Sequence, residues 1–334
     1  MNLITGATGL LGSHIAEQLH AAGKPVRALV RPGSDTRFLE SLGVELAEGD
    51  VTDAASLVEA CRGVSTDYHA AARVGDWGPW EQFVAVTVDG TRNLVQAAQK
   101  ADVQRFLHVS SISAYGHPDG EGLILDESAP LGANLYKWSY YSRAKVMAEE
   151  IVWAEYNAGR LPLTVCRPSW LYGPRDRASM PRLVRKIKQG KAKLIGDGTN
   201  RLNLTYAGNE AEGCILAAEH PDAVGESYNL SNDGEITQAG YFNGIAEAVG
   251  APPVTKTVPY SVAYNAAFMM ELFGHLFGRK KPPLVTRYAV WLIGRRCFFS
   301  SQKAREQLNW QPTVGYDEGI RIATQWCLEN VKDL

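Results

Sequence analysis

Three glycines spaced three residues apart lie near the start of the chain: Gly6, Gly9 and Gly12, in the segment TGATGLLG. They follow a short apolar run at residues 2–5 and precede a segment of helical periodicity at residues 10–22. Glycines let the backbone turn tightly and approach a pyrophosphate closely, and a helix N-terminus offers free N–H groups to phosphates. An ordinary strand-to-helix turn is the alternative, but the position between a strand and a helix favours a dinucleotide-binding turn.

The first half of the chain alternates short apolar runs with segments of helical periodicity. Further strands are predicted at residues 26–30, 44–47, 66–70, 106–110 and 163–167, and long helices at 81–100 and 141–158. The first helix should end at Gly23, because glycine suits the left-handed position after a helix and Pro25 cannot continue it. This alternation predicts an α/β fold, with a doubly wound parallel sheet covered by helices.

The pattern changes after Pro168, where loops rich in proline, glycine and basic residues begin. The regular alternation of strand and helix is lost there. We therefore expect a dinucleotide-binding domain from residues 1–168 plus about 203–232, and a smaller mixed substrate domain from about 169–202 plus 233–334.

The charge balance and the cysteines narrow the class of protein. The 334 residues carry 34 lysines and arginines against 36 aspartates and glutamates, which argues against electrostatic capture of nucleic acid. The five cysteines are scattered singly, so we expect reduced thiols and neither a disulfide framework nor a metal site. The first residues lack the basic and apolar regions of a signal peptide. These features predict a cytoplasmic protein.

Arg31 follows the second predicted strand, where a dinucleotide-binding fold normally places an acidic residue on the ribose hydroxyls. An acid would repel a 2′-phosphate, whereas arginine can pair with it. A solvated residue at the end of a strand is the alternative interpretation. Asp50 and Val51 close the third strand, in a position suited to contact an adenine ring.

Tyr141 and Lys145 lie four residues apart in YSRAK, so both side chains share one face of the predicted helix. A neighbouring ammonium stabilises a phenolate, so we expect Lys145 to lower the pKa of Tyr141. Ser110, Ser111 and Ser113 follow the strand at 106–110, and the carboxyl ends of parallel strands face the ligand crevice. One of these hydroxyls could orient a reacting oxygen, although each motif alone is also typical of ordinary helices and turns.

Together, the glycine-rich turn, a serine at a later strand end and Tyr-x-x-x-Lys on a helix resemble the extended short-chain dehydrogenase/reductase superfamily, which uses a Rossmann fold. The resemblance covers nearly the whole chain and includes EGDVTD at 48–53, HAAARV at 69–74 and RPSWLYGP at 167–174. It implies an active site in which Tyr141 is the acid/base, Lys145 binds the ribose and tunes the tyrosine, and Ser111 holds the reacting oxygen. Thr87 departs from the family, which usually has asparagine there, so a hydrogen bond near the cofactor should be made differently.

The resemblance also implies a nicotinamide cofactor, with NADP favoured over NAD because of Arg31. The residues expected to contact it lie on the glycine turn and at strand ends: Gly6, Thr8, Gly9, Leu10, Leu11, Gly12, Arg31, Asp50, Val51, Ala71, Ala72, Ser110, Tyr141, Lys145, Pro168 and Ser169.

Within the superfamily, the second part is most similar to 3β-hydroxysteroid and sterol dehydrogenases and to reductases of long-chain β-keto acids. Asn209 stands where sugar-nucleotide enzymes typically show a second aspartate, and the apolar stretch at 259–299 is similar to an insertion of the steroid enzymes. The loop VGDWGPW suits a large apolar ligand better than a diphosphate. We therefore expect interconversion of a hydroxyl and a ketone on a large apolar substrate, contacted by Trp77, Trp80, Ser113 and Tyr172.

Two other functions remain open. A nucleotide-sugar epimerase or dehydratase would need basic anchors for a diphosphate, which five arginines of the second part could supply: Arg175, Arg177, Arg182, Arg185 and Arg201. A cofactor-binding scaffold without turnover would not need to keep Ser111, Tyr141 and Lys145.

The segment 259–299 is almost apolar for about 20 residues, the length of a membrane span, before the basic Arg279-Lys280-Lys281. Asn265, Glu271 and His275 interrupt it, so helices packed over the second core are favoured over an interfacial contact with a membrane and over a true span. Peripheral membrane association therefore stays an alternative. The family resemblance finally implies a homodimer formed by the helices at 81–100 and 141–158.

Overall fold

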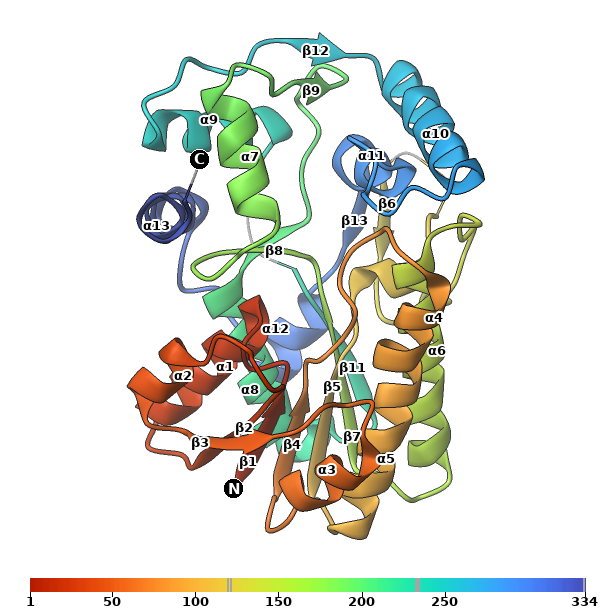
Figure 1. The fold of residues 1–334 in the computed structure, drawn as a ribbon, viewed down its shortest axis with the longest axis vertical. Coiled ribbons are helices and arrows are strands. Elements are labelled where there is room, and N and C mark those ends of the chain that lie inside the picture. Colours follow the sequence, from red (N-terminus) through yellow and green to blue (C-terminus); the bar gives the residue numbers. More distant parts are fainter. Residues whose placement is uncertain (119, 121, 232–234, 333) are drawn as a thin grey trace.

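The computed structural model describes residues 1–118, 120, 122–231, 235–332 and 334. One seven-stranded parallel sheet lies at its centre, in the order β11-β7-β5-β4-β1-β2-β3 (Figure 1). Its strands are β1 (Asn2–Thr5), β2 (Val26–Val30), β3 (Glu45–Glu48), β4 (Thr66–His69), β5 (Arg105–Val109), β7 (Leu163–Pro168) and β11 (Glu226–Leu230). The strand order reverses between β1 and β4, the point at which such sheets bind ligands.

Helices cover both faces of this sheet, as the sequence predicted. One face carries α1 (Leu10–Ala21), α2 (Arg37–Leu42), α8 (Ala207–Glu219) and α12 (Gln302–Leu308), which share one apolar core. The other face carries α3 (Ala54–Ala60), α4 (Trp80–Phe83), α5 (Gly90–Lys100) and α6 (Tyr140–Asn157). The doubly wound fold is therefore confirmed.

The end of α1 shows how local sequence sets these boundaries. Gly23 adopts φ 69°, its N–H donates to the carbonyl of His20 at 2.9 Å, and the N–H of Lys24 donates to that of Leu19 at 2.9 Å. This pair of bonds satisfies the last carbonyls of the helix and requires the left-handed conformation that glycine adopts without strain. The predicted helix at 81–100 is less regular, because a π-helical turn at Val84–Asp89 separates α4 from α5.

The rest of the chain packs over the carboxyl ends of the strands. It contains three parallel pairs: β8 (Trp170–Tyr172) with β10 (Leu204–Tyr206), β9 (Leu194–Ile195) with β12 (Thr257–Val258), and β6 (Leu123–Leu125) with β13 (Cys297–Phe299). Its helices are α7 (Ser179–Lys188), α9 (Gln238–Ala248), α10 (Tyr260–Leu276), α11 (Arg287–Gly294) and α13 (Tyr316–Asn330).

The packing shows which segments return to the sheet. β11 joins its edge beside β7, and α8 packs against α1. Ala304, Leu308 and Trp310 lie in the same core as α1, so α12 and the residues just after it pack against the sheet, although the sequence pattern assigns them to the substrate domain. The expected boundary at 232–233 lies outside the described residues.

Candidate active site

A cavity of about 780 Å³ opens at the carboxyl ends of the strands, between the glycine turn, the start of α6 and the helices of the second part. The structure brings every residue expected for catalysis or cofactor binding to its wall. These are Gly6, Thr8, Gly9, Leu10, Leu11, Gly12, Arg31, Asp50, Val51, Ala71, Ala72, Ser110, Ser111, Tyr141, Lys145, Pro168 and Ser169.

The glycine turn is packed so tightly that side chains are excluded. A Cβ at Gly12 would lie 2.3 Å from the carbonyl oxygen of Gly6, and a Cβ at Gly6 would lie 2.8 Å from the nitrogen of Ala71. Gly6 also has φ 72°, and its carbonyl accepts a 2.9 Å hydrogen bond from the N–H of Gly9, just before α1 begins. A bare backbone turn leading into a helix N-terminus fits the pyrophosphate of a dinucleotide.

The far end of the cavity offers groups for the adenosine part of such a cofactor. Arg31, at the end of β2, is exposed and lines the cavity. The Asp50 carboxylate accepts hydrogen bonds of 2.8 Å from the backbone N–H and the hydroxyl of Thr52, which fixes the loop after β3. The residues present therefore fit a dinucleotide, with a cation where an acid is usual.

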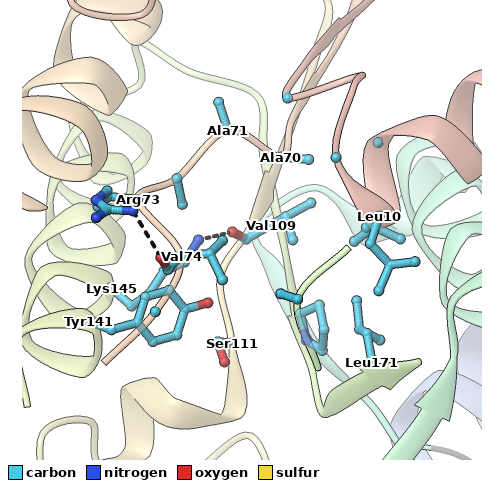
Figure 2. A pocket seen from close by; sticks show the side chains of 18 of the residues that line it. Leu10, Ala70, Ala71, Arg73, Val74, Val109, Ser111, Tyr141, Lys145 and Leu171 are labelled. Carbon is cyan, nitrogen blue, oxygen red and sulfur yellow. Dashed lines mark hydrogen bonds between the residues drawn. The ribbon is translucent and has the colours of Figure 1, made fainter. Parts of the chain in front are cut away.

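Ser111, Tyr141 and Lys145 meet at the opposite end of the cavity. Figure 2 shows the Tyr141 phenol and the Ser111 hydroxyl facing the same space, with Lys145 reaching toward Val109. The Lys145 ammonium donates a 2.6 Å hydrogen bond to the Val109 carbonyl. The Ser111 hydroxyl accepts a 3.1 Å bond from the N–H of Ser113, so its own hydrogen is free to donate into the cavity.

The pKa of Tyr141 is raised, which corrects the expectation that Lys145 lowers it. Burial of the phenol is the largest cause, and the nearby Ser111 hydroxyl lowers the pKa only in part. Burial also lowers the pKa of Lys145 to about 8, although the charge of Glu149 acts in the opposite direction. Desolvation therefore outweighs the attraction that the spacing suggested, and the site holds Tyr141 as a neutral phenol, the form that can donate a proton.

A chain of buried groups supports the loop after β4, which forms one wall of the cavity. His69 bridges Thr5 and Thr91, with 2.8 Å between each ring nitrogen and a threonine hydroxyl. Burial lowers the pKa of His69 to about 3, so the ring is neutral. The Thr87 hydroxyl accepts a 2.9 Å hydrogen bond from the N–H of Arg73. Thr87 therefore holds this loop by its hydroxyl group, at the position where the resemblance implied an asparagine.

A buried ion pair beneath the catalytic residues was not identified from the sequence. Arg167, at the end of β7, binds the Glu149 carboxylate at 2.5 Å, and Ser110 donates to the same carboxylate at 2.5 Å. Arg167 also donates to the Tyr115 hydroxyl at 2.7 Å, which in turn donates to Asn229 on β11 at 2.7 Å. The network joins α6 to β7, to β11 and to the residue that follows β5. Its one sequence signal was that Glu149 lies one helical turn after Lys145, on the same face.

None of the four residues expected to contact substrate lines the cavity. Trp77 packs against Gly274 and His275 of α10, Trp80 packs on Tyr140, and Tyr172 is buried among other tyrosines of the second core. Ser113 is buried near the Tyr288 phenol and does not reach the cavity wall. The sequence favoured these aromatic residues as substrate contacts, but it does not show which way the segments that carry them run in the fold.

The apolar wall next to the catalytic residues comes instead from α11. Tyr288, Ala289, Leu292 and Ile293 line the cavity there, with Leu171 of β8 and Val74 of the loop after β4. A large apolar ligand could be desolvated by these side chains while its oxygen faced Ser111 and Tyr141.

The arginines considered as diphosphate anchors are mostly engaged. Arg175 and Arg177 line the cavity, but Arg175 binds Glu17 at 2.5 Å and Arg177 binds Asp35 at 3.0 Å. Arg201 forms an ion pair with Glu235, and neither it nor Arg182 or Arg185 lines the cavity. Among the described residues, no group of three or more His, Cys, Asp or Glu side chains could hold a metal, and no helix is long and apolar enough to cross a membrane.

Comparison with known proteins agrees with this architecture. A model of the NAD dependent epimerase/dehydratase family matches residues 2–231. A 2-alkyl-3-oxoalkanoate reductase of Stenotrophomonas maltophilia (strain K279a) is 31% identical over 326 residues, covering 96% of this chain and 97% of the relative. A decarboxylating sterol-4-alpha-carboxylate 3-dehydrogenase of Mus musculus is 29% identical over 332 residues, covering 96% and 89%.

A solved structure, that of gox2253, superimposes with a TM-score of 0.83 at 31% identity over 98% of each chain. The family model spans the sheet from β1 to β11, which carries the glycine turn and the Ser-Tyr-Lys group. The chain therefore belongs to the NAD dependent epimerase/dehydratase family, the extended short-chain dehydrogenases/reductases, whose nicotinamide dinucleotide its glycine turn fits.

Proposed function

We propose that the protein is an NAD(P)-dependent oxidoreductase that interconverts a ketone and a hydroxyl group on a large apolar substrate, of the β-keto or β-hydroxy acid type. The observation that carries this proposal is that the Ser-Tyr-Lys group and the apolar side chains of α11 line the same cavity. The names of two relatives support it. A 2-alkyl-3-oxoalkanoate and a 3-hydroxysterol-4-carboxylate both carry their reacting oxygen on the carbon β to a carboxylate.

The residues divide the chemistry among them. When bound, the nicotinamide supplies or accepts the hydride. Tyr141 donates the proton to the ketone oxygen during reduction, which its neutral phenol allows. Ser111 donates a hydrogen bond to the same oxygen, since its hydroxyl accepts from the Ser113 N–H and keeps its own hydrogen for the substrate. Lys145 is held by the Val109 carbonyl with its remaining N–H groups available to the cofactor ribose.

For the cofactor we propose a preference for NADP over NAD. Arg31 lines the cavity at the end of β2 and is exposed, so its guanidinium can pair with a 2′-phosphate. For the location we propose the cytoplasm, a compartment that keeps thiols reduced, which suits the five free and buried cysteines.

A nucleotide-sugar epimerase or dehydratase is the second candidate, favoured by the family description and by the two arginines that reach the cavity. The pairing of Arg175 with Glu17 and of Arg177 with Asp35 weakens it, because a diphosphate would have to displace both carboxylates.

The test is a screen of purified protein by cofactor absorbance against 2-alkyl-3-oxo acids, steroids and sterol carboxylates, flavonoid-type ketones and nucleotide sugars. We expect NADPH oxidation with the 2-alkyl-3-oxo acids or NADP reduction with the hydroxy acids. The Tyr141→Phe variant, assayed in parallel, should show neither. Conversion of nucleotide sugars alone, without net change in the cofactor, would replace this proposal by the epimerase alternative.

A further inference from the structure

The outward side of α10 is mostly apolar. We call this surface the outer face of α10, formed by Val262, Ala266, Met269, Phe273 and Leu276, which follow each other at intervals of four and three residues on one side of the helix. Val262 is 56%, Met269 43%, Phe273 49% and Leu276 69% exposed, and the adjoining Phe277 is 76% exposed. Figure 1 shows α10 at the periphery of the molecule.

The one charged side chain of α10 and its histidine point inward, whereas Ser261 and Asn265 are its exposed polar residues. Glu271 is buried and forms a 2.6 Å ion pair with Arg287 of α11. The ring of Trp77 lies over Gly274 and against His275. A helix packed on an ordinary water-soluble core has the opposite arrangement, with apolar residues inside and charges outside. The outer face therefore exposes a contiguous apolar surface that calls for a partner.

A basic segment continues this surface at its C-terminal end. Arg279, Lys280 and Lys281 are exposed, and Leu284, 71% exposed, follows them. Between residues 259 and 284 the only acidic residue is Glu271, which is already paired. A second copy of this surface would therefore bring no carboxylate to the three cations. Anionic lipid headgroups would supply the negative charge that these cations lack.

We propose that the outer face of α10 and the basic segment 279–281 bind the surface of a phospholipid bilayer that contains anionic lipids. The helix lies in the plane of the interface, with its apolar side chains in the acyl boundary and the three cations among the headgroups. This inference concerns a surface outside the catalytic residues, and it does not depend on the proposed substrate.

The same surface adjoins the cavity. α10 packs against α11, whose Tyr288, Ala289, Leu292 and Ile293 form the apolar wall. The loop after β4 is joined to this pair by a 2.9 Å hydrogen bond from Trp77 Nε1 to the Arg279 carbonyl, and by a bond from the Thr286 hydroxyl to Asp76. When the protein is bound in this way, only α10 lies between the lipid and α11, which lines the cavity.

The test is co-sedimentation of the full chain with vesicles of equal parts phosphatidylglycerol and phosphatidylcholine, and with vesicles of phosphatidylcholine alone. We expect binding to the mixed vesicles that falls with added salt, because salt screens the headgroup attraction. Replacing Phe273 and Leu276 together by serine should reduce the partition coefficient about tenfold or more. Reversing Lys280 and Lys281 to glutamate should reduce it by a similar factor.

Matched control variants distinguish the role of this surface from the effect of losing an exposed apolar side chain or a positive charge anywhere on the protein. Ile124→Ser removes another exposed apolar side chain, and the pair Lys191→Glu and Lys193→Glu makes the same charge change at exposed positions elsewhere. Both should bind like the wild type, and the altered residues are exposed enough that thermal unfolding should change little in all four proteins. No binding by wild type, equal binding to both vesicle types, or equal loss in the controls would overturn the proposal. Sedimentation velocity measures the oligomeric state of the same proteins. If the wild type did not bind vesicles, and if the Phe273 and Leu276 changes dissociated an oligomer, the proposal would also be overturned.

Discussion

The Lys145 ammonium donates a 2.6 Å hydrogen bond to the carbonyl oxygen of Val109, the last residue of β5. The bond fixes the catalytic lysine to the carboxyl end of a central strand, and it buries a charge that Glu149 compensates only in part. Burial lowers the pKa of Lys145 from 10.5 to about 8, which means that holding this catalytic group in its charged form costs folding free energy.

Replacing Lys145 by methionine should therefore stabilise the protein while abolishing turnover. The unfolded lysine keeps its proton to higher pH than the folded one, so the unfolded state binds more protons between about pH 8 and 10.5, and wild-type stability rises across that window. We expect Lys145→Met to raise the free energy of unfolding by about 2 kcal/mol near pH 7 and by less near pH 10. Urea unfolding at both pH values measures this, with Lys100→Met as the exposed control; a gain of the same size at both pH values would contradict it.

Removing the Tyr141 hydroxyl should stop catalysis without preventing cofactor binding. Tyr141→Phe keeps the ring that lines the cavity and loses the proton donor, so kcat should fall by at least about 100-fold. The neighbouring Tyr140→Phe is the control, because Tyr140 packs on Trp80 and Phe83 away from the cavity. Steady-state kinetics and cofactor titration on both variants decide the matter. Comparable losses in the two would remove Tyr141 from its role.

Arg31 should determine the preference between the two dinucleotides. Arg31→Ala is expected to weaken NADP binding about tenfold or more and to leave NAD binding unchanged, because only NADP carries the 2′-phosphate. Arg92→Ala, an exposed arginine on α5, serves as the control. Calorimetric titration of both cofactors measures the difference, and equal NADP affinity in wild type and variant would exclude this role.

The glycine turn should tolerate no side chain at Gly12. A Cβ there meets the Gly6 carbonyl oxygen at 2.3 Å, so Gly12→Ala should cost at least about 2 kcal/mol of stability and weaken cofactor binding. Gly315→Ala is the matched control, since no atom lies within 4 Å of the added carbon, and it should cost less than about 1 kcal/mol. Thermal unfolding with and without cofactor compares them; a benign Gly12→Ala would mean that the turn relaxes.

The family resemblance predicts a homodimer formed by the helical faces of α4–α5 and α6. Met147 is 37% exposed on α6, and a charge there should disrupt such a contact, so Met147→Glu should give a monomer. Leu328→Glu changes an equally exposed residue on α13 and should leave the dimer intact. Sedimentation velocity at micromolar concentration measures both, and a monomeric wild type would refute the prediction.

The sequence predicted the fold and the catalytic end of the site because their signals are local. Gly23 ends α1, and Tyr141 lies one turn before Lys145 on α6; both patterns involve residues that are close in the chain. The predicted strands agree with the observed ones to within two residues for the same reason. The π-helical turn at Val84–Asp89 left no such signal and was missed.

What the sequence did not predict depends on contacts between distant segments. Glu149 and Arg167 meet only when α6 packs on β7, and Trp77 reaches α10 across some 200 residues of chain. The pKa of Tyr141 was misjudged because spacing reveals a neighbouring charge but not the degree of burial that outweighs it. The exposure of the outer face of α10 is likewise a tertiary property, and the sequence favoured a packed helix there.

The late arrival of β11 in the sheet has a consequence for biosynthesis. β7 is buried along its length, but during translation it is an unprotected edge until residues 226–230 leave the ribosome. Trp310, which lies in the core beneath the sheet, follows later still. The edge and the core of the nascent nucleotide-binding unit therefore close only after residue 310 has been synthesised, and the long interval exposes the unit to aggregation.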